Sequence, residues 1–228
     1  MQQLPLGVRI PDRAVFASFL PARNGEAVEY ASRVAGGELT GVVWICGTTG
    51  AGKTHLLQAV CARAGETMRA GYLPLAQLAT LGIEVLDGLR QLECLCVDDM
   101  ECVVGQIEWE RALFGVVREA QDGGSRLVFA AKSPPALLKW ALPDLGSRLT
   151  ASAVFQLRAL DEGEQQEALQ LRARVRGFEL PDETSRWLLR RFPRDMHTLY
   201  EILDTLDEAA LVAQRRLTVP FIRSVLRE

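Results

Sequence analysis

The sequence predicts an α/β fold with a five-stranded parallel sheet, followed by a small all-helical domain. Five short apolar runs, separated by segments of helix length, indicate a sheet that is covered on both faces. A glycine-rich loop after the first run joins a strand to a helix, as in nucleotide-binding α/β domains. Beyond about residue 160 the strand-like runs stop and helical periodicity takes over. The runs are 41–47, 71–75, 92–98, 126–131 and 154–160.

The segments between and after these runs supply the predicted helices. In the α/β part, helices are expected at 53–64, 108–121 and 134–141. The last part should contain four more, at 161–177, 181–192, 194–214 and 218–228. We therefore place an α/β domain at 11–160 and a helical domain at 161–228.

Arg172, Arg174 and Arg176 do not share one helical face, so the helix that carries them is expected to be solvated.

Composition narrows the range of partners. The 228 residues carry a net charge of −3, and the pI is about 5.6. A protein that binds DNA strongly through phosphate contacts is normally more basic, so autonomous DNA binding is not expected. The five cysteines form no C-x-x-C pair, which favours reduced, buried thiols and a cytoplasmic location. No apolar run reaches the ~18 residues of a membrane span, and the opening residues do not resemble a signal peptide.

The segment GTTGAGKT, residues 47–54, matches the phosphate-binding P-loop without a mismatch. Gly47, Gly50 and Gly52 allow the backbone to turn tightly and point its N–H groups at phosphate oxygens. Lys53 supplies a positive charge to the β- and γ-phosphates, and Thr54 offers a hydroxyl to Mg²⁺. The sequence therefore predicts a nucleotide site with a bound magnesium ion.

The run LECLCVDDME supplies the acidic strand end that such a site needs. Asp98 is placed to hold Mg²⁺ through water. Asp99 could polarise an attacking water, or it could instead cap the following helix. The sequence leaves both roles of Asp99, water activation and helix capping, open.

Beyond these motifs, the chain resembles the DnaA branch of the AAA+ class and, within it, the Hda family of DnaA-related regulators. The resemblance extends over essentially the whole chain. The segments LPDLGSRL (142–149) and RGFELP (176–181) are the more discriminating ones, because many unrelated ATPases share the P-loop. Further matching segments are FASF (16–19), CVDDMECV (96–103) and RRLTVPFIRSVL (215–226). The resemblance implies an AAA+ P-loop domain followed by a helical lid.

The resemblance also implies roles for two arginines. Arg148, in the SRL segment, matches the arginine finger that reaches a nucleotide on a neighbouring subunit. Arg194 matches the sensor-2 arginine, which contacts the phosphates of the chain's own nucleotide. Two departures speak against vigorous self-hydrolysis: Lys132 occupies the sensor-1 region, and Asp99 replaces the more common Glu. Related chains usually carry an uncharged or acidic polar residue in the sensor-1 region.

Residues 1–10 are interpreted as an extended peptide that binds the sliding clamp. Gln3, Leu4 and Leu6 resemble the N-terminal clamp-binding peptide of Hda-type proteins. Gln3 would hydrogen-bond at the rim of the clamp pocket, and the two leucines would fill it. Contact with DNA is expected only through the clamp, because the DNA-reading domain of DnaA is not expected in this chain.

The function implied by the resemblance is negative regulation of replication initiation. The chain would bind ADP or ATP with Mg²⁺ and stimulate hydrolysis of the ATP bound to DnaA. The oligomeric state stays open, with a homodimer among the options. The alternative is an autonomous AAA+ ATPase such as a helicase loader or remodeller, which would depend on Asp98 and Asp99 for its own turnover.

Overall fold

A computed structural model describes residues 14–193, 195–213 and 217–226. The chain divides into two compact units. The first comprises Arg23–Arg158 and the segment that ends at Phe16. The second comprises Ala17–Ala22 and the chain from Ala159 onward. Each unit is described by itself below.

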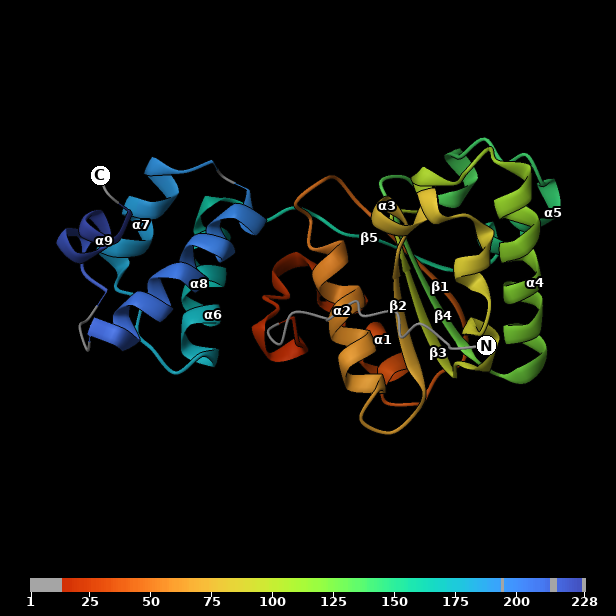
Figure 1. Ribbon diagram of the computed structural model, residues 1–228, viewed down its shortest axis with the longest axis horizontal. Helices are drawn as coiled ribbons and strands as arrows, with labels where there is room; N and C mark the ends of the chain where they lie inside the picture. The colour runs from red at the N-terminus through yellow and green to blue at the C-terminus, as the bar shows by residue number, and fades with distance from the viewer. Residues whose placement is uncertain (1–13, 194, 214–216, 227–228) are drawn as a thin grey trace. The chain divides into compact units, whose positions relative to one another are not determined.

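The first unit is an α/β layer structure around five parallel strands in the order β2-β3-β4-β1-β5. In Figure 1, α1 and α2 lie on one side of the sheet and α4 and α5 on the other. The predicted five-stranded parallel sheet is confirmed. The strands are β1 (Gly41–Cys46), β2 (Ala70–Pro74), β3 (Cys94–Asp98), β4 (Arg126–Ala131) and β5 (Ala153–Gln156).

Helix α1 precedes the first strand, and the other helices of this unit lie in the connections between successive strands. They are α1 (Gly25–Ala35), α2 (Lys53–Ala64), α3 (Leu75–Leu78), α4 (Ile107–Gly123) and α5 (Pro143–Thr150), with short 3-10 turns between them. The predicted helix at 53–64 is confirmed as α2, and the one at 108–121 as α4. Helix α1 was not predicted.

The helix predicted at 134–141 is wrong. Only a 3-10 turn, Pro135–Leu137, forms there, and the chain then runs on until α5 begins at Pro143. The Trp140 indole N–H donates to the Pro135 carbonyl at 2.8 Å, so that carbonyl is taken by a side chain instead of by the backbone N–H of residue 139. This bond closes the turn that forms in place of the predicted helix.

The core of the first unit is densely apolar on both faces of the sheet. Trp44 and Phe129 are fully buried on the face that α4 and α5 cover, together with Leu113 and Leu145. Four of the five cysteines are buried as expected, but Cys102 is exposed, because it lies in the 3-10 turn after β3 rather than in a strand.

The second unit is helical, as predicted. It contains α6 (Glu162–Val175), α7 (Asp182–Arg191), α8 (Met196–Ala213) and α9 (Val219–Leu226). Leucines dominate its core, and Leu20 from the earlier segment packs against that core.

Two residues at the ends of the first unit form a reciprocal pair of hydrogen bonds. The Asn24 amide donates to the Arg158 carbonyl at 2.9 Å, and the Arg158 N–H donates back to Asn24 at 2.8 Å.

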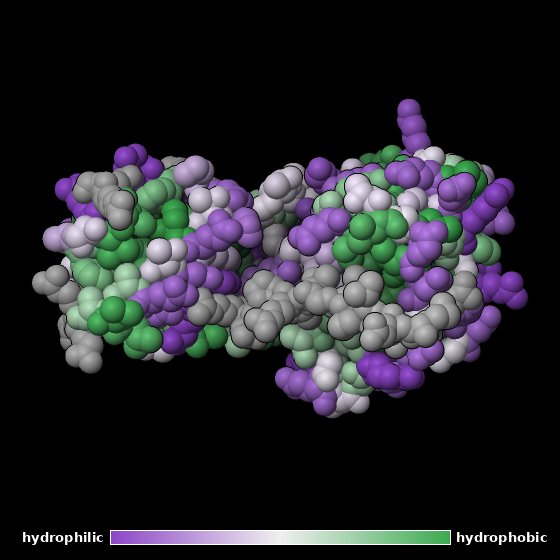
Figure 2. Space-filling view, in the orientation of Figure 1, coloured by the Kyte–Doolittle hydropathy of each residue, from purple (hydrophilic) through white to green (hydrophobic). Residues whose placement is uncertain are grey.

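The visible surface mixes polar and apolar residues, as Figure 2 shows. The most exposed large apolar side chains are Leu81 and Leu137 in the first unit, and the neighbours Leu211 and Val212 near the end of α8 in the second. Within the described residues, none of the helices has the length and apolar character needed to cross a bilayer.

Candidate nucleotide site and partner-facing arginine

The P-loop of the sequence forms the turn between β1 and α2. Gly50 (φ 79°) and Gly52 (φ 93°) adopt left-handed backbone conformations that favour glycine. Gly47 is required for a different reason. A Cβ atom built on it would lie 2.8 Å from the Leu157 carbonyl oxygen, so a side chain has no room. The three glycines thus shape the loop as predicted, directly in front of the first turn of α2.

Lys53 is the first residue of α2 and is buried. Its ammonium donates to the Gly47 carbonyl at 2.8 Å and to the Thr48 carbonyl at 3.0 Å. These bonds hold the charge inside the curve of the loop, where a phosphate would meet it together with the helix N-terminus. Thr54 follows with an exposed side chain, which leaves its hydroxyl accessible.

Asp98 ends β3 and is buried. Its carboxylate accepts the Tyr72 hydroxyl at 2.9 Å and the Asp99 backbone N–H at 3.0 Å. Burial, followed by the charge of Asp98, raises the pKa of Tyr72, so the phenol remains a donor to the carboxylate. Tyr72 was not singled out in the sequence. The one feature of the sequence that could have indicated Tyr72 is its position in β2, the strand that pairs with β3.

Asp99 stands in the left-handed region, with φ 57°. It precedes the 3-10 turn Met100–Cys102, yet its side chain makes no capping hydrogen bond there. Burial raises the pKa of Asp99, and the charges of Asp98 and Glu101 raise it further, while Lys53 and Lys132 act in the opposite direction. The structure therefore brings three acids and two lysines into one electrostatic cluster.

Lys132, the unusual residue of the sensor-1 region, is paired with an acid. Its ammonium lies 3.4 Å from the Glu101 carboxylate, and its backbone N–H donates to the same side chain at 3.3 Å. The backbone of the next residue is fixed as well, because the Trp44 indole N–H donates to the Ser133 carbonyl at 3.1 Å. Lys132 thus forms a solvent-accessible ion pair with Glu101, a partner that the sequence does not predict.

These residues fit a nucleoside phosphate with a divalent cation. The glycine loop supplies backbone donors, and the Thr54 hydroxyl and Asp98 carboxylate are the hard oxygen ligands that Mg²⁺ takes in such sites. Within the described residues, no cluster of three or more His, Cys, Asp or Glu side chains could hold a metal by itself.

Arg148 lies on α5 and is exposed. Its guanidinium donates to the Gln121 side-chain oxygen at 2.6 Å and stacks over the Phe114 ring at 5.2 Å from the centroid. Both partners belong to α4. The remaining predicted positions, Arg194 and the N-terminal Gln3, Leu4 and Leu6, lie outside the described residues.

Comparison with known proteins places these features in one family. A model of the bacterial DnaA ATPase domain matches residues 11–156, which is well over half of the chain. The chain belongs to the bacterial DnaA ATPase family. A second model, of the lid domain of Hda, matches residues 161–226.

Solved structures agree with this DnaA-type fold. Domain III of the Thermotoga maritima replication initiation protein DnaA matches with a TM-score of 0.76 and 21% identity, over 95% of this chain and 97% of that one. AMPPCP-bound DnaA from Aquifex aeolicus matches with a TM-score of 0.69 and 19% identity, over 87% of this chain and 66% of that one. A putative primosome component from Streptococcus pyogenes matches less well, with a TM-score of 0.52 and 16% identity, over 68% and 93%.

In the Hda-type lid, the arginines of α6 correct one expectation. Arg172 and Arg176 are buried rather than solvated, since positions four apart share a helix face. Arg172 stacks over the Tyr200 ring at 4.3 Å. Arg176 pairs with Asp204 and, at 3.0 Å, with Asp207, both on α8. The pairs fix α6 against α8.

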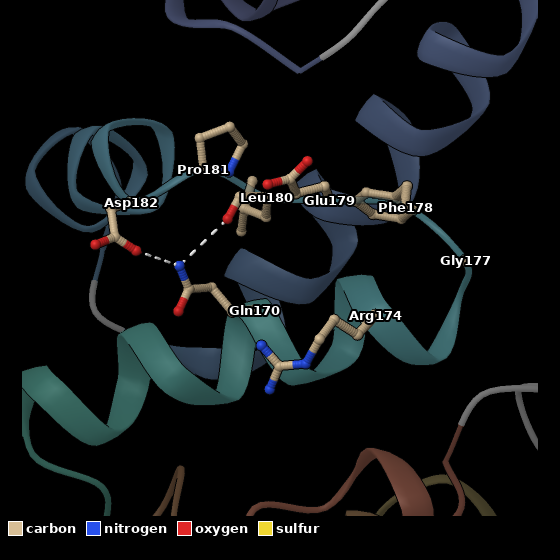
Figure 3. Close-up of a pocket in the computed structure, with 8 residues that line it drawn as sticks. All are labelled: Gln170, Arg174, Gly177, Phe178, Glu179, Leu180, Pro181 and Asp182. Atoms are coloured by element: carbon tan, nitrogen blue, oxygen red, sulfur yellow. Dashed lines mark hydrogen bonds between the residues drawn. The ribbon is translucent and has the colours of Figure 1, made fainter.

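The RGFELP segment of this DnaA-family chain forms the turn between α6 and α7. Gly177 provides a left-handed conformation (φ 85°). Figure 3 shows the Gln170 amide donating to the Leu180 carbonyl (3.2 Å) and to the Asp182 carboxylate (2.7 Å). The turn lines a shallow cavity of about 730 Å³, which contains no P-loop residue. A structural role of this segment within the lid accounts for these contacts.

Proposed function

We propose that this chain is a nucleotide-binding regulator that inactivates DnaA by stimulating hydrolysis of DnaA-bound ATP. Membership of the DnaA family, with an Hda-type lid, supports a role in regulating DnaA. The observation that carries the finer proposal is Arg148. It is an exposed arginine on a short helix and is available to a nucleotide on a neighbouring molecule. An arginine supplied in trans accelerates phosphoryl transfer by roughly 10³–10⁵-fold.

The chain's own site would bind ADP or ATP with Mg²⁺. The P-loop, Lys53 and Thr54 would hold the phosphates and cation, and Asp98 would orient the metal-bound water. When bound, the magnesium ion neutralises charge on the phosphates. Arg194 would add a contact from the lid. Weak intrinsic hydrolysis is expected, because Lys132 occupies the sensor-1 region and Asp99 stands where a Glu is more common. Asp99 would be the residue that activates water.

The N-terminal peptide would tether the chain to the DNA-loaded sliding clamp. Leu4 and Leu6 would each contribute up to roughly 1.5–3 kcal/mol if fully buried in the clamp pocket. Gln3 would add a hydrogen bond at its rim. Tethering raises the local concentration of the regulator near DnaA and so compensates for a weak direct contact.

The test is hydrolysis of labelled ATP pre-bound to DnaA, in the presence of clamp loaded on DNA. Wild-type protein should accelerate hydrolysis, and Arg148→Ala should abolish the effect. Arg69→Ala is the matched control, since Arg69 is also exposed, with 66% of its side chain accessible, and lies on another edge of the same unit. Removal of residues 1–7 should abolish the dependence on clamp, whereas Gln2→Ala should not.

Two outcomes would contradict the proposal. The first is no acceleration by the wild-type protein. The second is steady ATP turnover by the isolated chain that Lys53→Ala abolishes, together with full activity of Arg148→Ala. That pattern would favour an autonomous ATPase such as a helicase loader or remodeller.

A further inference from the structure

Arg148 is held in one orientation by two side chains of α4. Its guanidinium donates to the Gln121 amide oxygen at 2.6 Å, while its central carbon lies over the Phe114 ring at 5.2 Å from the centroid. An exposed arginine normally samples many rotamers, because its long side chain has several free torsions. The two contacts are of different kinds: one is a hydrogen bond from an N–H group, and the other is a cation–π contact with the charged group as a whole.

The backbone under Arg148 is fixed as well. The buried Glu110 carboxylate of α4 accepts the Leu142 N–H at 2.6 Å, just before α5 begins. Gly146, two residues before Arg148, packs so closely on Trp140 that an added Cβ would lie 2.5 Å from the indole ring. With α5 secured in this way, the orientation of the guanidinium depends mainly on its own side-chain torsions.

We propose that Gln121 and Phe114 are positioning residues that keep the Arg148 guanidinium extended at the surface, ready to meet a nucleotide bound by a partner. This inference rests on the function proposed above. Ordering the arginine before the encounter removes an entropic cost that would otherwise be met in the transition state.

The chemistry of the holding groups suits this role. Gln121 is a neutral acceptor, so it orients the guanidinium without cancelling its charge. A carboxylate at the same place would form a bidentate ion pair and compete with a phosphate. A nearby carboxylate on the same helix, Asp122, lies 3.9 Å from Arg118 instead. The hydrogen bond and the ring contact also leave further guanidinium N–H groups for a phosphate.

The first experiment measures the order of the Arg148 side chain directly, in the isolated full chain. NMR relaxation at the Arg148 Nε–Hε bond should report an ordered side chain in the wild type. Gln121→Leu and Phe114→Leu should each lower its order parameter, whereas Phe114→Tyr, which keeps the ring, should not. Asp122→Asn is the matched control beside Gln121. An Arg148 that is as mobile in the wild type as in the variants would overturn the inference.

The second experiment measures the consequence, with DnaA-bound ATP as the reporter. Gln121→Leu and Phe114→Leu should lower the maximal stimulated rate by about two- to fivefold, the range expected for losing one exposed cation–π or hydrogen-bond contact. The DnaA concentration at half-maximal effect should stay constant. Gln121→Glu should keep Arg148 ordered and yet lower the rate, because it neutralises the charge.

The outcomes separate the two proposals. Unchanged or increased maximal rates in Gln121→Leu would overturn the positioning role, as would a loss confined to the half-maximal concentration, which would make these side chains partner contacts instead. Full activity of Arg148→Ala would overturn the proposed function itself, and the positioning role with it, whatever the NMR result.

Discussion

Glu110 offers a sharp test of how the first unit is held together. This side chain is fully buried on α4, and its two oxygens accept the Gly105 and Leu142 backbone N–H groups, each at 2.6 Å. A buried donor that loses its partner costs about 1–3 kcal/mol. The two donors here are only part-buried, since Gly105 is exposed and Leu142 is half-buried, so we take the lower part of that range for each and expect Glu110→Ala to lower the free energy of unfolding by about 2–4 kcal/mol. Glu110→Gln keeps one acceptor and should cost roughly half as much.

The assay is urea unfolding, combined with amide hydrogen exchange at Gly105 and Leu142. Both amides should exchange much faster in Glu110→Ala than in the wild type. Glu108→Ala is the matched control, because Glu108 is an exposed acid in the same first turn of α4 and should change stability by about 1 kcal/mol or less. Equal losses for the two alanine variants, or protected amides in Glu110→Ala, would refute this reasoning.

Three further predictions concern other parts of the chain. Gly146→Ala should destabilise the first unit by about 1–3 kcal/mol in thermal unfolding, because the new methyl group collides with Trp140; an unchanged melting temperature would contradict the close contact. Asp99→Asn should stabilise the fold at neutral pH. Because the pKa of Asp99 is raised in the folded state, the contribution of this one group to stability is fully present below its ordinary pKa of 3.8 and is lost as pH rises through the folded-state pKa, so the gain from Asn should vanish in acid. Arg176→Met should cost the lid about 1–3 kcal/mol in urea unfolding, because it removes the ion pairs of a buried arginine with two half-buried acids, Asp204 and Asp207, whereas the exposed Arg174→Met should be nearly neutral.

Local patterns predicted the sheet and the P-loop well. A continuous apolar run ending in Gly47 and followed by helix-forming residues specifies a strand, a turn and a helix within one short segment. The helix predicted at 134–141 failed because its apolar residues serve a tertiary role. The Trp140 indole N–H takes the Pro135 carbonyl, which the backbone N–H of residue 139 would bond in a helix.

Charged residues were harder to interpret. Arg172 and Arg176 are four positions apart, so they share a face even though Arg174 does not, and that face meets the acids of α8. Glu110 had one signal in the sequence, its spacing of three from the buried Leu113 on the apolar stripe of α4. Its partners, however, are backbone groups far apart along the chain. No pattern of residue types reveals such contacts, and the same holds for the meeting of Lys132 with Glu101.

The order of segments along the chain has a consequence for inheritance and engineering. The helical unit is discontinuous, since Ala17–Ala22 precedes the sheet while the remainder follows it, and the partly buried Leu20 packs against the leucine-rich core. A lid exchanged between relatives as a single C-terminal cassette would therefore lose the apolar cover that Leu20 provides for this core. Successful chimaeras should transplant both segments together, and natural recombination at residue 159 alone should be selected against.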